Sequence, residues 1–400
     1  MSLDVSAGLP APVAEWVDPF ELMADPYPSY KRLRELGPVV FAPSMDRYLI
    51  TRYDAVRDVL NDASLFSSHS FDEGPLVQAL GGRSMVSKDD PDHATERGAI
   101  NPTMRPRRMK EVWSPKFTQA VETWIDHMLE IGPEEADLNR DFAGPVASQN
   151  LIDLLGFPPD TDVNDMRRWS TDLVAGIGNV VDDQDIWRRV ARTTAEVDAV
   201  LDDLLRRLKH KPDHSIISHL QQVGLPEDLV RANVRLTISG GMNEPQHMVT
   251  NMVWSLSQYP DQRAAARAGD VTWGAVFEET VRWLSPIQAD GRRSTQEVNL
   301  HGSLIPENSD LFILLASANR DEAVYSDGDS FDINRNAPSH FGFGGGVHLC
   351  AGKYAARTAI GETAIPKLYE RLPGLAIDES RKSSWDGFVF RGLVTCPVTW

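Results

Sequence analysis

The sequence predicts a mostly helical protein with smaller β elements. The longest helical pattern covers residues 225–259, and another covers residues 187–210. Apolar residues recur at a 4-3-4 spacing between residues 117 and 128, which indicates a helix with one face in a core. Two short runs within residues 39–51 flank a Pro-Ser-Met-Asp turn and predict a β-hairpin. Helices therefore dominate the expected fold.

Capping and helix-breaking residues define the shorter elements. An Asp-Pro pair at residue 25 opens a helix that runs to Leu36, where Gly-Pro stops it. Asp54 is expected to cap a short helix that ends at Leu60. Residues 145–155 are expected to form a helix that ends at Gly156.

Other segments look less regular. Glycine and polar residues between 67 and 88 predict a long loop, and long loops in compact domains often carry function. Residues 171–183 contain two glycines and show a weaker helical pattern, and the tail after residue 379 resembles strands. Residues 1–20 are rich in Pro and Ala and are expected to form a flexible leader.

Composition excludes several classes of function. Lys and Arg number 40 and Asp and Glu number 58, which gives a net charge of −18 and argues against nucleic acid or an anionic membrane as partner. The two cysteines cannot build a disulfide framework. There is no signal-peptide pattern, and no apolar stretch reaches the roughly 18 residues that a membrane span needs. We expect a soluble, cytoplasmic monomer.

A glycine-rich stretch with a cysteine is the most informative part of the chain. Residues 343–352 read Phe-Gly-Gly-Gly-Val-His-Leu-Cys-Ala-Gly, and an amphipathic run follows at residues 354–368. Glycine allows a backbone to approach a flat ligand closely, and a helix N-terminus favours the ionised form of Cys350. A thiolate is a soft metal ligand. One alternative is a buried cysteine with a purely structural role. A zinc site is disfavoured, because His348 and Cys350 supply only two of the four ligands that it needs. A nucleotide loop would need a third glycine where Val347 stands.

The pattern Phe-Gly-x-Gly-x-His-x-Cys-x-Gly resembles the haem-binding loop of the cytochrome P-450 family. The resemblance implies that Cys350 is the ligand of the haem iron and that Phe343, Gly344 and His348 help to bind haem b. It extends over almost the whole chain. It implies the cytochrome P-450 fold in one catalytic domain, residues 21–400, after the leader at residues 1–20.

Two further segments resemble the family's ligands of the haem propionates. His93 and Arg97 are four residues apart, so on a helix they share one face. Alone they would be taken for a solvated surface pair. The resemblance implies that they bind propionates, which need cationic or N–H donors. Arg292, ten residues before Gly302, matches another propionate ligand, and Arg293 is a possible substitute.

The middle of the longest helical pattern conflicts with a helix. Residues 239–245 read Ser-Gly-Gly-Met-Asn-Glu-Pro, and Pro245 cannot donate to the carbonyl of Gly241, a loss of about 3 kcal/mol in an ordinary helix. The resemblance implies a helix that crosses the distal face of the haem and is broken here to leave a groove for O₂. The family carries an acid followed by threonine at the positions of Asn243 and Glu244, which are expected to be catalytic. The alternative is a kinked helix with a surface glutamate.

The sequence Glu279-x-x-Arg282 is a weak signal by itself. Its position between the long helix and the cysteine loop is the one that the resemblance requires. The resemblance then implies a buried ion network with Arg335, which shapes the protein and does not act on substrate.

The subfamily is suggested by Gly-Gly-Met-Asn-Glu-Pro-Gln-His and by the C-terminal sequence, which look similar to bacterial enzymes that O-demethylate guaiacol- and syringol-type methoxyphenols. This similarity implies a small aromatic substrate and release of formaldehyde. Residues 171–183 would cover the substrate pocket. The expected pocket residues are Gly240, Ile287, Ala289 and Phe390. Two alternatives are a hydroxylase of a terpene, fatty acid or secondary metabolite, and a haem-binding sensor or carrier without turnover.

The oxidant and electron donor follow from the same resemblance. The family uses O₂ with electrons from NAD(P)H, delivered by a ferredoxin or a ferredoxin/flavin reductase, and Glu244 suggests that H₂O₂ is an alternative oxidant. A basic cluster is expected to dock the donor, although it could also be a solvated run of charges. Its members are Arg105, Arg107, Arg108, Lys110 and Lys353.

Overall fold

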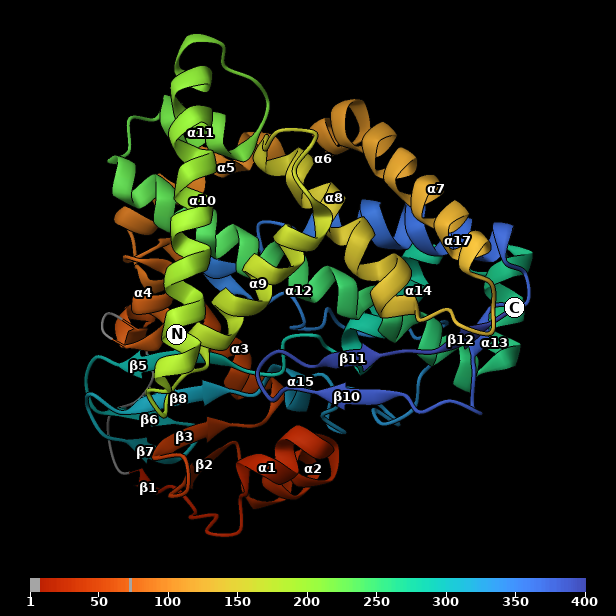
Figure 1. Ribbon diagram of the computed structural model, residues 1–400. Coiled ribbons are helices and arrows are strands. Elements are labelled where there is room, and N and C mark those ends of the chain that lie inside the picture. The colour runs from red at the N-terminus through yellow and green to blue at the C-terminus, as the bar shows by residue number, and fades with distance from the viewer. Residues whose placement is uncertain (1–7, 72–73) are drawn as a thin grey trace. The chain divides into compact units, whose positions relative to one another are not determined.

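The structure is a computed structural model that describes residues 8–71 and 74–400 (Figure 1). Helices make up most of it, so the predicted fold class is confirmed. The chain divides into two units. Unit 1 is built from described residues of Met1–Ser70, Ser255–Cys350 and Ser384–Val394. Unit 2 is built from Phe71–Trp254, Ala351–Ser383 and Thr395–Trp400.

Unit 1 contains most of the β structure. Its largest sheet has the strand order β2-β3-β8-β5-β4, in which β3 and β8 run parallel and the other pairs are antiparallel. A second sheet has the order β1-β7-β6, and β10 pairs with β11. The strands are β1 (Leu9–Pro10), β2 (Val39–Ala42), β3 (Arg47–Ile50), β4 (Phe66–Ser67), β5 (Asp290–Ser294), β6 (Val298–Leu300), β7 (Ser303–Ile305), β8 (Asp310–Ile313), β10 (Ser384–Asp386) and β11 (Gly392–Thr395).

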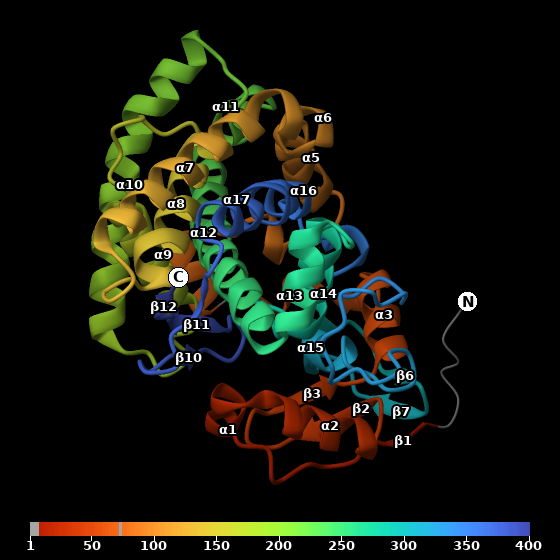
Figure 2. The same cartoon turned by 90° about the vertical axis from the view of Figure 1, so that its right-hand side faces the viewer.

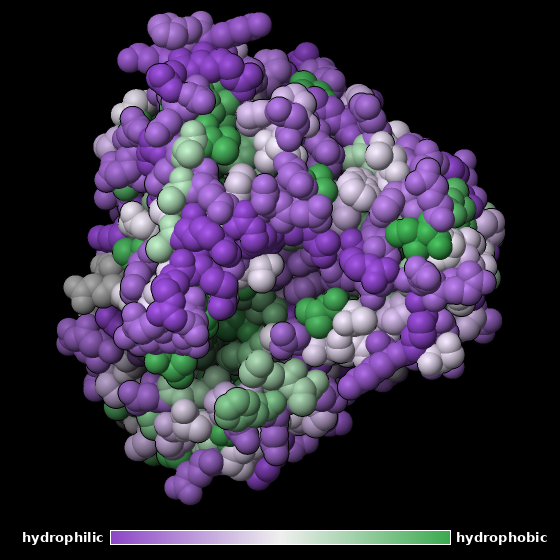
Figure 3. Space-filling model, in the orientation of Figure 1, coloured by the Kyte–Doolittle hydropathy of each residue, from purple (hydrophilic) through white to green (hydrophobic). Residues whose placement is uncertain are grey.

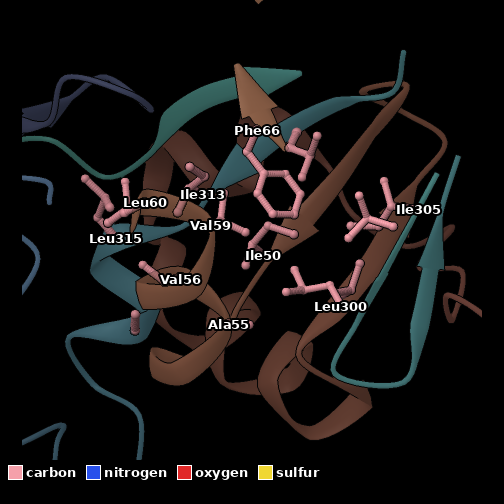
Figure 4. Packing of buried hydrophobic residues seen from close by; sticks show 14 of the residues in the cluster. Ile50, Ala55, Val56, Val59, Leu60, Phe66, Leu300, Ile305, Ile313 and Leu315 are labelled. Carbon is pink, nitrogen blue, oxygen red and sulfur yellow. The ribbon is translucent and has the colours of Figure 1, made fainter. Parts of the chain in front are cut away.

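The helices of unit 1 cover these sheets. In Figure 4 the ring of Phe66 lies among aliphatic side chains that include Ile50 and Val59, which come from a strand and a helix. A second core cluster joins Tyr30 and Leu33 to the sheet, beside which α2 lies in Figure 2. The helices are α1 (Pro19–Ala24), α2 (Pro26–Leu36), α3 (Tyr53–Asn61), η1 (Ser68–Phe71), α13 (Pro260–Ala268), α14 (Trp273–Trp283), α15 (Leu315–Ala318) and η5 (Gly346–His348).

The N-terminal part of unit 1 tests the predicted caps. The hairpin β2–β3 and helix α2 are confirmed, and the Asp25 carboxylate accepts a hydrogen bond from the N–H of Tyr27. The predicted cap of α3 is wrong. The helix begins at Tyr53, so Asp54 lies in its first turn and pairs with Arg57. Within the expected leader, Ala11, Ala14 and Val17 are buried, so this part of the segment is packed.

Unit 2 is almost entirely helical. The helices α7, α8, α9 and α10 pack against one another in sequence (Figure 1). Its two short strands, β9 (Ala376–Ile377) and β12 (Val398–Thr399), form an antiparallel pair. The helices are α4 (Pro75–Leu80), η2 (Met85–Ser87), α5 (Asp92–Met104), α6 (Pro106–Arg108), η3 (Met109–Trp113), α7 (Ser114–Ile131), η4 (Asn139–Ala143), α8 (Gly144–Leu155), α9 (Val163–Ile177), α10 (Gln184–His210), α11 (Ile216–Gln222), α16 (Lys353–Ala356), η6 (Arg357–Ala364) and α17 (Ile365–Arg371).

Several predictions for unit 2 can be compared with these bounds. Helix α8 ends at Leu155, and Gly156, which follows it, has a φ of 85°, the left-handed conformation expected of a glycine that terminates a helix. The irregular run expected at residues 171–183 is wrong in its first half, because α9 continues to Ile177. The expected loop at residues 67–88 contains the short helices η1, α4 and η2, and residues 72–73 lie outside the described part of the chain.

Helix α12 (Glu227–Gln258) is the longest element, as predicted, and most of it belongs to unit 2. The expected break at Pro245 is wrong, since the helix continues through this residue. The fixed φ of proline is compatible with a helix, and neither the missing N–H nor the clash of the ring with the Gly241 carbonyl ends the helix here. The turns on both sides keep the element helical.

The surface agrees with the acidic composition. Hydrophilic residues cover most of the face that Figure 3 shows. Among residues 8–71 and 74–400, none of the helices combines the length and apolar character that crossing a bilayer requires.

Candidate active site

The cysteine loop of unit 1 closes on itself through its backbone. The N–H of Cys350 donates to the carbonyl of Phe343 over 2.9 Å, and the N–H of Gly344 donates to the carbonyl of Phe341 over 2.8 Å. These bonds fix the cysteine beside the residue that begins the motif. The side chain of Cys350 is exposed, whereas that of Cys396 is buried and its thiol pKa is raised by burial. Reactive thiols are usually partly exposed and buried structural ones inert, so Cys350 fits the expected ligand better than Cys396 does.

Two glycines explain the shape of this loop. Gly346 has a φ of 59°, and a Cβ there would lie 1.9 Å from the carbonyl oxygen of Leu60, so no other residue fits. At Gly344, with a φ of 68°, the nearest atom to a Cβ would be 3.9 Å away. The backbone at Gly344 therefore presents an open surface, against which a flat ligand can pack.

Side chains of unit 1 hold the loop in place. The ring of Phe343 stacks on that of Phe277 with a centroid separation of 6.1 Å. Nε2 of His348 lies 2.9 Å from the hydroxyl of Ser68. The loop is thus anchored at its first residue and again at His348.

The predicted ion network lies in the interior of unit 1. Nη2 of Arg282 lies 2.7 Å from Oε1 of Glu279, and Nε of Arg335 lies 3.3 Å from the same oxygen. Arg282 also donates to the carbonyls of Asn319 and Gly328, each over 2.8 Å. A buried carboxylate is stable only when it is paired. This network ties α14 to the chain that leads into the cysteine loop.

Arg292 is buried in β5, where it donates to Asp290 over 2.9 Å and to the carbonyl of Gly291 over 2.6 Å. Its possible substitute, Arg293, donates to Asp310 over 2.8 Å. The strand therefore presents one buried and one more exposed cation.

Two of the expected pocket residues meet in unit 1. Ile287 and Phe390 face each other across an isolated antiparallel bridge, and the N–H of Gln288 donates to the carbonyl of Val389 over 2.9 Å. Ala289 is buried in the neighbouring core cluster. This arrangement places an aliphatic and an aromatic side chain next to each other.

The expected catalytic residues lie in α12 of unit 2. The carboxylate oxygens of Glu244 lie 3.8 and 3.9 Å from the position that a Cβ on Gly240 would take, so the side chain folds back over the preceding turn. Its Oε2 is buried and has no hydrogen-bond partner in the described part of the chain. Burial raises the pKa of Glu244 to about 8. Asn243 accepts a hydrogen bond from Gln246 over 3.3 Å.

Sequence reasoning missed His247, which lies three residues after Glu244 on a neighbouring part of the helix surface. Its ring is buried, its Nδ1 has no partner among the described residues, and burial lowers its pKa to about 4. The sequence signal that could have identified His247 is its spacing of three residues from Glu244, which places two side chains close together on a helix. Glu244 and His247 are therefore both neutral near pH 7.

The other expected propionate ligands lie in α5 of unit 2. Nδ1 of the buried His93 lies 3.0 Å from Oδ1 of Asp90, and Nε of the half-buried Arg97 donates to Asn101 over 3.1 Å. By chemical type, the thiol of Cys350 in unit 1 suits the iron of a haem, and the imidazole and guanidinium groups of His93 and Arg97 in unit 2 suit its propionates.

The opposite pKa shifts of Glu244 and His247 predict opposite dependences of stability on pH. The pKa of Glu244 rises from 4.5 to about 8 on folding, so its stabilising contribution is complete below pH 4.5 and is lost as pH rises through 8. The pKa of His247 falls from 6.5 to about 4, so its contribution is complete above pH 6.5 and is lost as pH falls through 4.

The quantity to compare is the free energy of unfolding of the wild type minus that of Glu244→Gln. We expect this difference to fall as pH rises, by at most about 5 kcal/mol. The same difference taken with His247→Gln should rise with pH. Denaturant unfolding at a series of pH values measures both. Slopes of the same sign, or flat profiles, would contradict the two burial assignments.

Comparisons with known proteins agree with the site. Residues 273–361 match the family described as Cytochrome P-450. The vitamin D(3) 25-hydroxylase of Pseudonocardia autotrophica is 30% identical over 394 residues, which cover 94% of each chain. The steroid C26-monooxygenase of Mycolicibacterium smegmatis is 30% identical over 87% of this chain and 86% of its own.

A solved structure of a relative, in complex with an acyl carrier protein that carries hexadec-9Z-enoic acid, superimposes with a TM-score of 0.87. It is 25% identical and covers 96% of this chain and 100% of its own. The fold, the cysteine loop and relatives of this identity and coverage lead to one conclusion: the chain belongs to the cytochrome P-450 family and is a haem-thiolate monooxygenase of the bacterial type.

Proposed function

We propose that this monooxygenase O-demethylates a small methoxyphenol of the guaiacol or syringol type and that it can use H₂O₂ as oxidant. The observation that carries the proposal is the sequence Asn243-Glu244-Pro245 in α12, with a buried carboxyl where the family usually has threonine. The same residues carry the similarity to the methoxyphenol O-demethylases.

Bound haem supplies the chemistry of oxygen insertion into a C–H bond. We propose that the thiolate of Cys350 holds its iron, and that His93, Arg97 and Arg292 hold its propionates, with Phe343, Gly344 and His348 shaping the binding loop. Ile287, Ala289, Phe390 and Gly240 would contact the substrate. An aromatic contact with a flat ring contributes about 0.5–1.5 kcal/mol beyond burial.

Glu244 is the proposed acid–base group. With a pKa of about 8, close to working pH, both forms of Glu244 are populated near neutrality: the ionised form can accept a proton and the protonated form can donate one, as a general acid–base catalyst needs. It can take a proton from one oxygen of H₂O₂ and return it to the other, while Asn243 orients the oxidant. Hydroxylation of the methoxy carbon gives a hemiacetal, which collapses to a phenol and formaldehyde.

The family's ordinary route uses O₂ and electrons from a reductant. We propose a ferredoxin or a ferredoxin/flavin reductase as the donor, docked on the basic cluster of residues 105–110 and Lys353, because steered association suits a basic patch on an acidic chain. The names of the two relatives reported above favour a second candidate, the hydroxylation of a larger, sterol-like substrate.

The role of Cys350 is tested by absorption spectroscopy. We expect the reduced, carbon-monoxide-bound wild type to show the red-shifted Soret band of thiolate ligation and Cys350→Ser to lose it. Cys396→Ser is the matched control, since this buried thiol has no proposed role. Loss of the band in the control with retention in Cys350→Ser would refute the assignment.

The substrate class is tested by ligand titration and product analysis. Guaiacol or syringol should shift the ferric haem to high spin and yield formaldehyde during turnover. Sterols and fatty acids serve as the comparison. If these bind tightly while no methoxyphenol changes the spectrum, the hydroxylase candidate replaces the proposal.

The acid–base role is tested with Glu244→Gln. General acid–base catalysis contributes about 10²–10⁴-fold, so we expect the rate supported by H₂O₂ to fall by at least about 10²-fold, with substrate binding nearly unchanged. Glu227→Gln, an exposed glutamate of the same helix, should keep the full rate. Peroxide turnover of Glu244→Gln at the wild-type rate would show that the carboxyl group only lines the pocket.

A further inference from the structure

A histidine just before the cysteine loop has both of its ring nitrogens engaged within unit 1. His340 lies three residues before Phe343, and its side chain is 9% exposed. Its Nδ1 accepts a hydrogen bond from the N–H of Gly342 over 3.1 Å. Its Nε2 lies 3.0 Å from Oε2 of Glu278 in α14. The resemblance to the haem-binding loop begins only at Phe343, so sequence reasoning did not include this residue.

These two contacts determine which ring nitrogen carries the proton. A backbone N–H can only donate, so Nδ1 of His340 must be unprotonated to accept from Gly342. The proton of the neutral ring is then on Nε2, from which it is donated to the carboxylate of Glu278. With the proton on Nδ1 instead, two donors would face each other. Glu278 therefore favours the tautomer that the bond to Gly342 requires.

The contacts of His340 extend to the first residue of the motif. The ring centroids of His340 and Phe343 are 6.0 Å apart. Gly342 is packed against α14, because a Cβ there would lie 2.4 Å from Cγ1 of Val281. The backbone between His340 and Phe343 is thus held both by the histidine ring and by α14.

This backbone carries the hydrogen-bond acceptor for the cysteine. The N–H of Phe341 donates to Oδ1 of Asn319 over 2.7 Å, which fixes the same segment at another point. The carbonyl of Phe343 accepts from the N–H of Cys350 over 2.9 Å. A displacement of Phe343 would therefore change the position of Cys350.

We infer that His340 is a positioning residue for Cys350: its Nδ1 holds the N–H of Gly342, and the segment fixed in this way presents the Phe343 carbonyl to the N–H of Cys350. Glu278 keeps the histidine ring in the tautomer that this arrangement needs. The inference rests on the proposed function, in which Cys350 is the ligand of the haem iron. It predicts that the bond between the thiolate and the iron is lost faster when Nδ1 is removed.

The test measures how fast that bond is lost. Its readout is the decay of the red-shifted Soret band of the reduced, carbon-monoxide-bound protein, in denaturant too dilute to unfold the chain. His340→Phe keeps an aromatic ring beside Phe343 but has no ring nitrogen. We expect it to speed the decay about fivefold, the factor expected for the loss of one hydrogen bond. His340→Asn places an amide oxygen near the position of Nδ1, so its decay should return close to the wild-type rate.

The role of Glu278 is tested by the protonation of the ring. Nitrogen NMR spectra of the same carbon-monoxide complex, labelled at histidine, should show His340 of the wild type with its proton on Nε2. Glu278→Leu removes the acceptor of this proton, so it should show a mixture of tautomers and a faster decay of the Soret band. Glu278→Gln keeps an acceptor and should match the wild type in both measurements.

Controls separate this role from a general loss of stability. His127→Phe makes the same exchange in α7 of unit 2, where the ring contacts Trp124, and should leave the decay unchanged. Unfolding followed by circular dichroism identifies the denaturant concentrations at which every variant is folded. If His340→Phe does not fold, the comparison of Glu278→Leu with Glu278→Gln still decides the question.

Failure of the proposed function and failure of this inference give different results. If Cys350→Ser keeps the red-shifted band, the ligand assignment in the proposed function is wrong. If Cys350→Ser loses the band, but His340→Phe decays at the wild-type rate or His340→Asn decays as fast as His340→Phe, the inference is wrong. A wild-type ring with its proton on Nδ1 would contradict the inference as well.

Discussion

A carboxylate is stable inside a protein only when a cation or a strong donor faces it, and much of this structure depends on that constraint. Glu279 is surrounded by Arg282 and Arg335, which come from α14 and from a segment more than fifty residues further along the chain. Glu96 is held by Lys88 and Asn233. Each buried carboxylate therefore joins segments that are distant in sequence, one set in unit 1 and one in unit 2.

Glu244 meets the same constraint differently. Its buried oxygen has no partner in the described part of the chain, and the cost of desolvation appears as a raised pKa. The group avoids an unfavourable charge by keeping its proton. His247 responds to burial in the opposite sense, by losing its proton. Glu244 and His247 are thus both neutral near pH 7, and pKa values perturbed by burial in this way are found more often at functional sites than elsewhere.

The sequence predicted the parts of this protein that depend on local patterns. The long helix and the hairpin follow from the periodicity of the sequence, and the glycine at the end of α8 follows from a left-handed backbone conformation. Neighbouring residues determine both. It was wrong at some local points, such as the cap at Asp54 and the break at Pro245, and it missed several contacts between distant residues. The Lys88–Glu96–Asn233 network joins positions far apart in the chain, and the need for glycine at residue 346 comes from the carbonyl of Leu60. The motif identified the cysteine loop, but not what packs against it.

In the proposed function, glutamate in place of threonine in α12 would change how proton supply depends on pH. A hydroxyl group stays neutral across the physiological range and can only pass a proton along. A carboxyl group with a pKa of about 8 is mostly protonated at neutral pH and loses its proton in mildly alkaline solution. Its environment sets this value: the carboxyl lies over Gly240, within van der Waals range of the position that a Cβ there would take, and burial is the main cause of the raised pKa, with no cation contributing to it. A cation next to Glu244 would lower its pKa and favour loss of the proton, so the proposed acid–base role depends on the lack of an ion pair at this position among the described residues.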